Sequence, residues 1–249
     1  MEIIMFDILE RYQASFFVKA TDIIPSPEVI SILLNMFSDK GFLPTTFQEI
    51  GSQSPSPQVR LRLNSKNNEW GINFASHRID IEKNPVVAAG KNVGDVETFA
   101  KETKDFFSRI LGHFRKKGHR LSIITSGMLK EMTHKELLGV YTKLFRPLPF
   151  YERDMPFEWK CRCVARSEKH IKESGPLNVI TNINRVKGKL FDPTNYTPEF
   201  ERIEVTFDIN TIAENEDARF NAESFNDFFS SALDIRSDIL NQIRKVIYG

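Results

Sequence analysis

The residues best suited to chemistry lie in the stretch EWGINFASHRIDIEKNP, at positions 69–85. Within seven of these positions fall an imidazole, two carboxylates and two cations, namely His77, Arg78, Asp80, Glu82 and Lys83. Carboxylates close to a lysine can hold a magnesium ion for nucleic-acid cleavage. The stretch also alternates apolar and polar residues, which is typical of a hairpin with one buried and one solvated face. We therefore expect Asp80 and Glu82 to be exposed on a surface hairpin.

A metal-dependent nuclease would need a further carboxylate on a neighbouring strand. Glu158 and Lys160 supply an acid-x-lysine pattern, but Asp154 lies only four residues before Glu158, which is too close for a preceding strand. Asp80 could replace it only through an unusual path of the chain. We therefore predict that Asp80 and Glu158 lie apart and assign no catalytic residues and no metal site; a function without catalysis is favoured, and the nuclease is kept as an alternative.

Other motifs for catalysis or cofactor binding are incomplete. Cys161, Cys163 and His170 would need a fourth ligand to form a closed zinc site. Ser126 is followed by Gly127 but lacks the preceding glycine of a nucleophile elbow. The glycines occur singly, so the chain has no phosphate-binding loop of the G-x-x-x-x-G-K type. These observations predict reduced thiols and no cofactor.

The stretch HFRKKGHR, at positions 113–120, contains a cluster of cations. Its ordinary interpretation is a helix C-terminus, because cations near that end match the negative pole of the helix dipole. The functional alternative is a patch that contacts nucleic-acid phosphates. The candidate residues for that patch are Arg115, Lys116, Lys117, His119 and Arg120, with Arg60 and Arg62 from a neighbouring strand.

Composition sets the class of protein but not its activity. The chain has 249 residues, 41% of them hydrophobic and 27% charged, which is enough for a folded core. The formal net charge of +1 provides no overall attraction to nucleic acid or to anionic membranes. No apolar run approaches the roughly 20 residues that span a bilayer. The start MEIIMFDILERYQ is acidic and does not match a secretory signal, so we expect a cytoplasmic protein without membrane contact.

The order of hydrophobic patterns predicts an α+β fold with two β-sheet and helix halves, mostly antiparallel strands and helices packed on one face. In the first half, strands are predicted at 14–23, 59–65, 69–82 and 119–129, and helices at 26–41 and 95–118. In the second half, strands are predicted at 158–167, 177–186 and 202–210, followed by a helix at 222–247. We assign an N-terminal half at 1–144, a proline-bearing connector at 145–157 and a C-terminal half at 158–249, which could form two packed sheets or one continuous sheet.

The order of these features resembles a sporadically distributed, uncharacterised prokaryotic protein family of similar length. The segments that carry the resemblance are GFLPTTFQE, WGINFASHRIDIEKNP, the helix from Val96, RLSIITSGML, and IEVTFDIN before a Phe-rich helix. The resemblance implies no activity and no catalytic residues; it implies a bacterial or archaeal cytosolic protein encoded among mobile or defence genes.

The sequence is therefore compatible with three functions. The leading hypothesis is a non-catalytic protein-interaction or assembly module, with a protein partner or self-association at a sheet edge or in a groove between the halves. The alternative is nucleic-acid binding through residues 113–120. A metal-dependent nuclease is the third.

Overall fold

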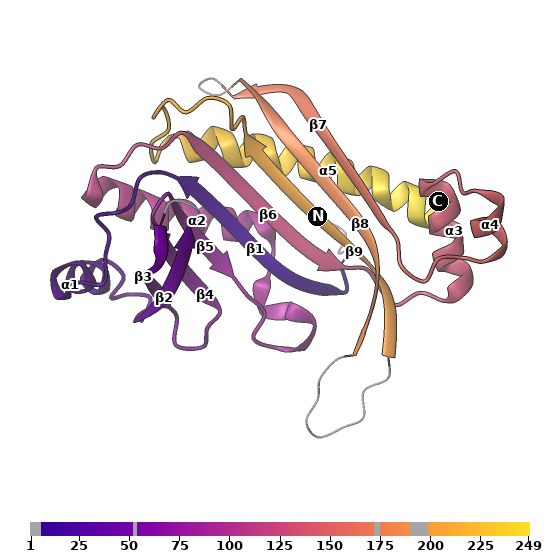
Figure 1. Ribbon diagram of the computed structural model, residues 1–249, viewed down its shortest axis with the longest axis horizontal. Helices are drawn as coiled ribbons and strands as arrows, with labels where there is room; N and C mark the ends of the chain where they lie inside the picture. The colour runs from indigo at the N-terminus through magenta and orange to yellow at the C-terminus, as the bar shows by residue number, and fades with distance from the viewer. Residues whose placement is uncertain (1–5, 52–53, 172–174, 190–198) are drawn as a thin grey trace.

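The computed structural model describes residues 6–51, 54–171, 175–189 and 199–249, which form one nine-stranded antiparallel sheet and five α-helices (Figure 1). The strands lie across the sheet in the order β2-β3-β4-β5-β1-β6-β9-β8-β7. Their bounds are β1 (Ile8–Phe17), β2 (Leu43–Gly51), β3 (Ser54–Asn64), β4 (Trp70–Ala75), β5 (Arg78–Lys83), β6 (Arg120–Met128), β7 (Lys160–Ile171), β8 (Gly175–Lys189) and β9 (Glu199–Thr211). The helices are α1 (Pro27–Met36), α2 (Val96–Phe114), α3 (His134–Leu144), α4 (Pro149–Arg153) and α5 (Ser224–Tyr248), and a 3-10 helix, η1, covers Ala88–Val93. The α+β class is therefore confirmed.

Two helices begin at the caps that the sequence predicts. The Ser26 side chain accepts a hydrogen bond from the backbone N–H of Val29 at the start of α1. Asp95 does the same for Thr98 at 2.7 Å at the start of α2. A side-chain oxygen at this position satisfies an N–H that has no partner within the helix. Because these bonds join residues only three positions apart, the position where each helix starts can be predicted from local sequence.

Several elements differ from the sequence-based expectation; β1, for example, covers Ile8–Phe17 instead of the predicted range 14–23. The strand β2 covers residues that we did not assign, and β3 already begins at Ser54, inside a segment predicted as a Pro/Ser loop. Helices α3 and α4 were also not predicted. Segment 54–58 contains two prolines, which are tolerated in strands near a sheet edge.

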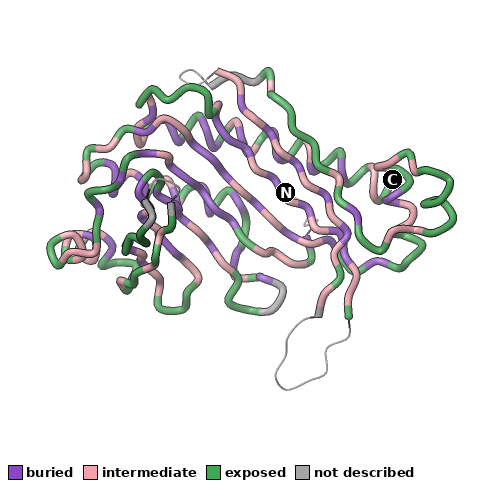
Figure 2. Tube along the Cα trace, viewed as in Figure 1, coloured by how far each residue is buried: buried purple, intermediate pink, exposed green. Residues whose placement is uncertain are grey.

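One face of the sheet is apolar and packs against α2 and α5. Tyr12 and Phe16 of β1 contact Phe99 and Phe107 of α2, with ring centroids 5.4 and 6.0 Å apart. Phe107 also stacks on Phe225 of α5 at 4.4 Å, so the two helices meet beneath β1. Figure 1 shows both helices behind the strands, and Figure 2 shows the buried positions concentrated along the central strands. This aromatic layer forms the main core.

The opposite face of the same strands is polar. Ser15, Asp80, Ser122 and Asn210 occupy paired positions on β1, β5, β6 and β9, so their side chains share this face. All four are buried. The Ser15 side chain donates a hydrogen bond to Asp80 at 2.6 Å. The Ser122 and Asn210 side chains both donate to Asp208, at 3.0 and 2.9 Å. The central strands are thus covered by apolar side chains behind and by a polar network in front.

A second apolar cluster lies where α3 and the end of α5 meet the last strands. Leu137, Tyr141 and Trp159 pack there with Phe207 and Ile243. Strands from both predicted halves pair directly, because β6 forms an antiparallel ladder with β9. The described residues therefore form one continuous sheet. Among them, no helix is both long enough and apolar enough to cross a membrane.

Candidate protein-interaction site

The connector at 145–157 carries large apolar side chains that the fold leaves exposed. Leu148 is 66% exposed, Phe150 is 58% exposed and Phe157 is 84% exposed. The five-residue helix α4 holds Phe150 against Tyr151, with ring centroids 5.2 Å apart. Single exposed apolar residues are common, but several in one short segment are typical of an interaction surface.

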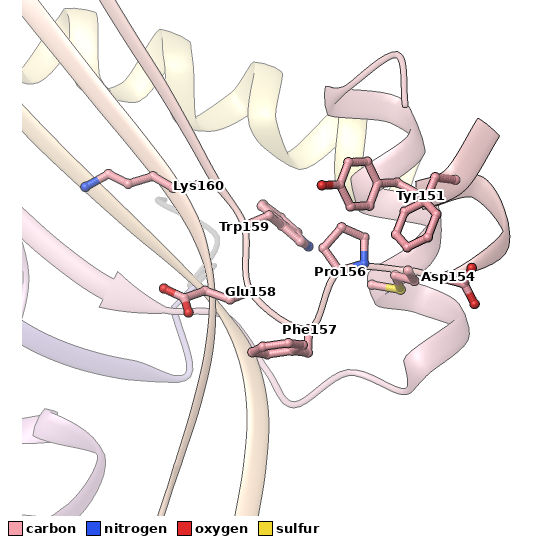
Figure 3. A pocket seen from close by; sticks show the side chains of 9 residues that line it. Tyr151, Asp154, Pro156, Phe157, Glu158, Trp159 and Lys160 are labelled. Atoms are coloured by element: carbon pink, nitrogen blue, oxygen red, sulfur yellow. The ribbon is translucent and has the colours of Figure 1, made fainter. Parts of the chain in front are cut away.

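Phe150, Tyr151 and Phe157 line a pocket of about 600 Å³ between α4 and the start of β7 (Figure 3). Phe157 stands at its edge, and Trp159 forms its inner wall. Figure 3 shows the Trp159 ring turned toward Tyr151 and Pro156, whereas the Glu158 and Lys160 side chains point to the other side of the strand. Glu158 and Lys160 also line the pocket, so its wall combines aromatic rings with charged residues at the start of β7. We call this pocket the connector pocket.

The Trp159 ring packs against two other aromatic rings, and its indole N–H has no hydrogen-bond partner among the described residues. Its ring centroid lies 5.6 Å from that of Phe145 and 6.0 Å from that of Tyr141. Only 7% of the residue is exposed. Within the part of the chain that the structure describes, its indole N–H has no hydrogen-bond acceptor. A buried donor without an acceptor costs free energy, and an acceptor brought by a bound partner would remove that cost.

Strand β7 continues from the pocket along an edge of the sheet. Among the described residues only β8 pairs with β7, so the other side of β7 is unpaired there. All residues from Arg162 to Arg166 are exposed, including Cys163 and Ala165, whose side chains point toward the helix side. Val164 is 55% exposed. Neither sheet face is therefore covered in the middle of β7, and this open edge is continuous with the connector pocket.

The candidate phosphate-binding residues are not brought together as one accessible patch. Arg115, in the left-handed conformation with φ 50°, and Lys117 are exposed after α2. Lys116 forms an ion pair with Asp22 at 2.6 Å. Arg120 lies over the Phe17 ring at 4.7 Å. Only Arg115 and Lys117 of this group remain as exposed cations without an ion pair among the described residues.

The other three candidates are held by structural contacts. Arg60 is only 2% exposed, and its guanidinium donates to the carbonyls of Ala20 at 2.6 Å and Phe74 at 3.0 Å. It therefore supports the fold and does not face a ligand, which corrects its assignment. Arg62 donates to the Asn64 side chain at 2.7 Å and lies 3.7 Å from Glu82. His119 is half-buried, and burial lowers the pKa of its imidazole.

The exposure predicted for Asp80 is wrong. Asp80 is 4% exposed because its side chain lies in the polar network over the sheet centre. Glu82 is half-buried. Four strands separate β5 from β7, which carries Lys160 and directly follows Glu158. At the usual spacing of strands, five steps amount to about 24 Å. Asp80 and Glu158 therefore lie too far apart to bind one metal ion, as predicted.

The cysteines do not form a recognisable metal centre. Cys161 and Cys163 are free thiols. Burial, with the neighbouring Cys163, raises the pKa of the Cys161 thiol. The side chain of His170 lies outside the described residues, and among those that are described no group of three or more potential ligands is close enough to hold a metal.

From the sequence, residues 145–157 are expected to form only a connector. The signal for an interaction site was present in FRPLPFYERDMPF, where aromatic residues alternate with prolines and follow neither a helical nor a strand period. Phe145 packs against Trp159, whereas Phe150 and Phe157 are exposed. No protein-family model, curated protein or solved structure matches the chain, so the site is interpreted from its own geometry.

Proposed function

We propose that the protein is a non-catalytic interaction module that binds a protein partner at the edge formed by the connector pocket and β7. One observation carries this proposal: the exposed apolar residues of the connector lie directly beside an unpaired strand edge. An exposed edge offers backbone hydrogen bonds, and an adjacent pocket accepts a side chain. The two features together match a protein ligand better than a small molecule or a nucleic acid.

The proposed architecture is consistent with this role. We propose two halves, at 1–144 and 158–249, that share the sheet and carry their helices on one face. In that arrangement the helices stabilise the sheet from behind, and the connector at 145–157 lies at the far end from β2. The setting that we propose is the cytoplasm of a prokaryote, in an assembly related to defence.

The test compares capture of a partner by wild-type protein and by a variant of the connector. Purified protein is cross-linked in a lysate of the native host, and the stoichiometric partner is identified by mass spectrometry. Binding of that purified partner is then measured with Phe157→Ser. We expect this variant to bind at least about tenfold more weakly, because hot-spot aromatic residues carry much of an interface's free energy.

Ile50→Ser provides the matched control. Ile50 is 80% exposed and lies on β2, the opposite edge of the sheet. The Ile50→Ser variant should bind the partner as tightly as wild type does. Equal weakening by both substitutions, or the absence of any stoichiometric partner, would contradict the proposed function.

Nucleic-acid binding is the second candidate, and the observation in its favour is that Arg115 and Lys117, two residues apart after α2, are both exposed. Two cations form a small phosphate-contact surface. The salt dependence of binding to duplex DNA separates this candidate from the first, because phosphate contacts weaken as salt concentration rises.

A further inference from the structure

We propose that β7 binds an acidic, extended peptide segment as an additional antiparallel strand, with one apolar side chain of that segment in the connector pocket. This inference rests on the proposed function and specifies the chemistry of the partner. Three features support it: the unpaired backbone of β7, the charge of its exposed side chains, and the position of the pocket at its start.

The backbone of β7 is available over several residues. Between Lys160 and Arg166, the described backbone makes no hydrogen bond beyond its ladder with β8. Alternate N–H and C=O groups of this segment therefore point outward. Every neighbouring pair in the sheet is antiparallel, so an added antiparallel strand continues the existing hydrogen-bond pattern.

The side chains of β7 select for acidic residues. Lys160, Arg162 and Arg166 alternate along the strand and share the polar face of the sheet. Arg166 is paired with Glu214, whereas Lys160 and Arg162 have no ion pair among the described residues. Cross-strand pairs of opposite charge are stabilising, and like charges directly opposite are destabilising. A partner strand with glutamate or aspartate opposite these cations is therefore favoured.

The same charges disfavour a second copy of this chain as the occupant. In an antiparallel pair of β7 strands centred on Cys163, Lys160 faces Arg166 of the other copy. Centring on Val164 places Arg162 opposite Arg166. That second register also places Lys160 opposite Glu168, and the next one places Arg162 opposite Glu168, but Glu168 lies in the β-bulge between Ser167 and His170, where regular pairing is interrupted. Charge complementarity thus points to a different, acidic segment.

The geometry also gives the pattern of that segment. Residues opposite Arg166, Arg162 and Lys160 face the polar side and are acidic, and the residue opposite Val164 is a small apolar one. The residue opposite Trp159 points to the pocket side and is aromatic or large and apolar. An antiparallel ligand therefore reads acid-x-apolar-x-acid-x-acid-aromatic from its N-terminus.

The probe is a fluorescein-labelled peptide, Glu-Thr-Val-Thr-Glu-Thr-Glu-Phe, with binding measured by fluorescence anisotropy. We expect wild-type protein to bind it at least about tenfold more tightly than a peptide of the same composition in scrambled order. Methylation of alternate backbone nitrogens, on the side that faces β7, should abolish binding because those groups donate to the ladder. Equal affinity for the ordered, scrambled and methylated peptides would overturn the proposal.

Substitution of one exposed cation tests the charge preference. The substitution Arg162→Glu should weaken binding of the acidic peptide about tenfold. A peptide with lysine in place of the glutamate opposite position 162 should bind this variant more tightly than it binds wild type. Lys66→Glu is the matched control, since Lys66 is an exposed cation in the turn between β3 and β4. A similar loss in both variants would show a general charge effect and contradict the proposed site.

Two further results separate this inference from the proposed function. If the natural partner binds through Phe157 but neither peptide binds, the acidic-strand proposal is wrong and the interaction module stands. If wild-type protein is a dimer by light scattering and Arg162→Glu changes that state, the occupant is a second copy and the proposal is overturned. Peptide binding by a monomeric wild-type protein supports it.

Discussion

The Ser15 hydroxyl donates a hydrogen bond of 2.6 Å to the Asp80 carboxylate, across the pairing of β1 with β5. Arg78 approaches the same carboxylate at 2.8 Å. Burial raises the pKa of Asp80, while the bond from Ser15 and the charge of Arg78 oppose part of that rise. Asp80 is thus a structural acid at the centre of the polar face, where the folded protein holds a proton more tightly than the unfolded chain does.

Asp80→Asn should make stability less dependent on pH. A raised folded-state pKa contributes stability that is complete below the unfolded pKa of about 3.9 and is lost as pH rises through the folded pKa. The asparagine has no such titration. We therefore expect the unfolding free energy of wild type, relative to Asp80→Asn, to fall as the pH rises above about 4, until the folded-state carboxyl is fully ionised. Urea unfolding across this range is the measurement, and a constant difference would contradict the raised pKa.

Arg60 should matter for stability and not for ligand binding. Its guanidinium satisfies two backbone carbonyls and lies 3.6 Å from Glu49. Arg60→Met leaves those buried acceptors without a donor, at a cost of about 3 kcal/mol in unfolding free energy. Arg62→Met is the control, because Arg62 is half-buried on the same strand and should lose less than about 1 kcal/mol. Comparable losses in the two variants, from chemical denaturation, would refute the structural role of Arg60.

Local signals allowed several elements to be predicted from the sequence. The helices α1 and α2 have side-chain caps and an apolar stripe, and both properties depend only on nearby residues. The meander from β3 to β5 follows from alternation with short turns. In contrast, β2 pairs only with β3, and its sequence contains Pro44 and two threonines instead of a clear alternation.

The site was harder to predict because it depends on tertiary placement. Alternation assigned Asp80 to the polar face correctly but could not show that the centre of a nine-stranded sheet shields that face. The Arg60 side chain is buried by Ala20 and Phe74, which are distant in sequence. The position of β7 at the edge also depends on strand order, which no local pattern specifies.

Nucleic-acid binding by residues after α2 should be weak and only slightly salt-dependent. Two phosphate contacts, from Arg115 and Lys117, give a log-log salt slope of about −1.8 on duplex DNA, at about −0.9 for each contact. Fluorescence anisotropy at several salt concentrations measures this slope. Replacing both residues with alanine should remove it. Binding with this slope that is lost in the double variant would support the nucleic-acid candidate, whereas binding that is unchanged in the double variant would contradict it.

The stack of Phe107 on Phe225 should couple the two proposed halves in unfolding. The rings lie 4.4 Å apart with an interplanar angle of 12°, and both side chains are fully buried. Phe107 belongs to the half at 1–144 and Phe225 to the half at 158–249. Phe225→Ala should lower the unfolding free energy by about 3 to 5 kcal/mol, because it leaves a cavity in the shared core.

The same substitution tests whether the halves are independent. Since the core contains residues from both, we expect a single cooperative transition that shifts as a whole, observed equally by near-UV and far-UV circular dichroism. Phe157→Ala, at an 84% exposed position, should leave the transition almost unchanged. Two separate transitions in Phe225→Ala, with only one of them shifted, would show instead that each half folds by itself and that the stack merely joins them.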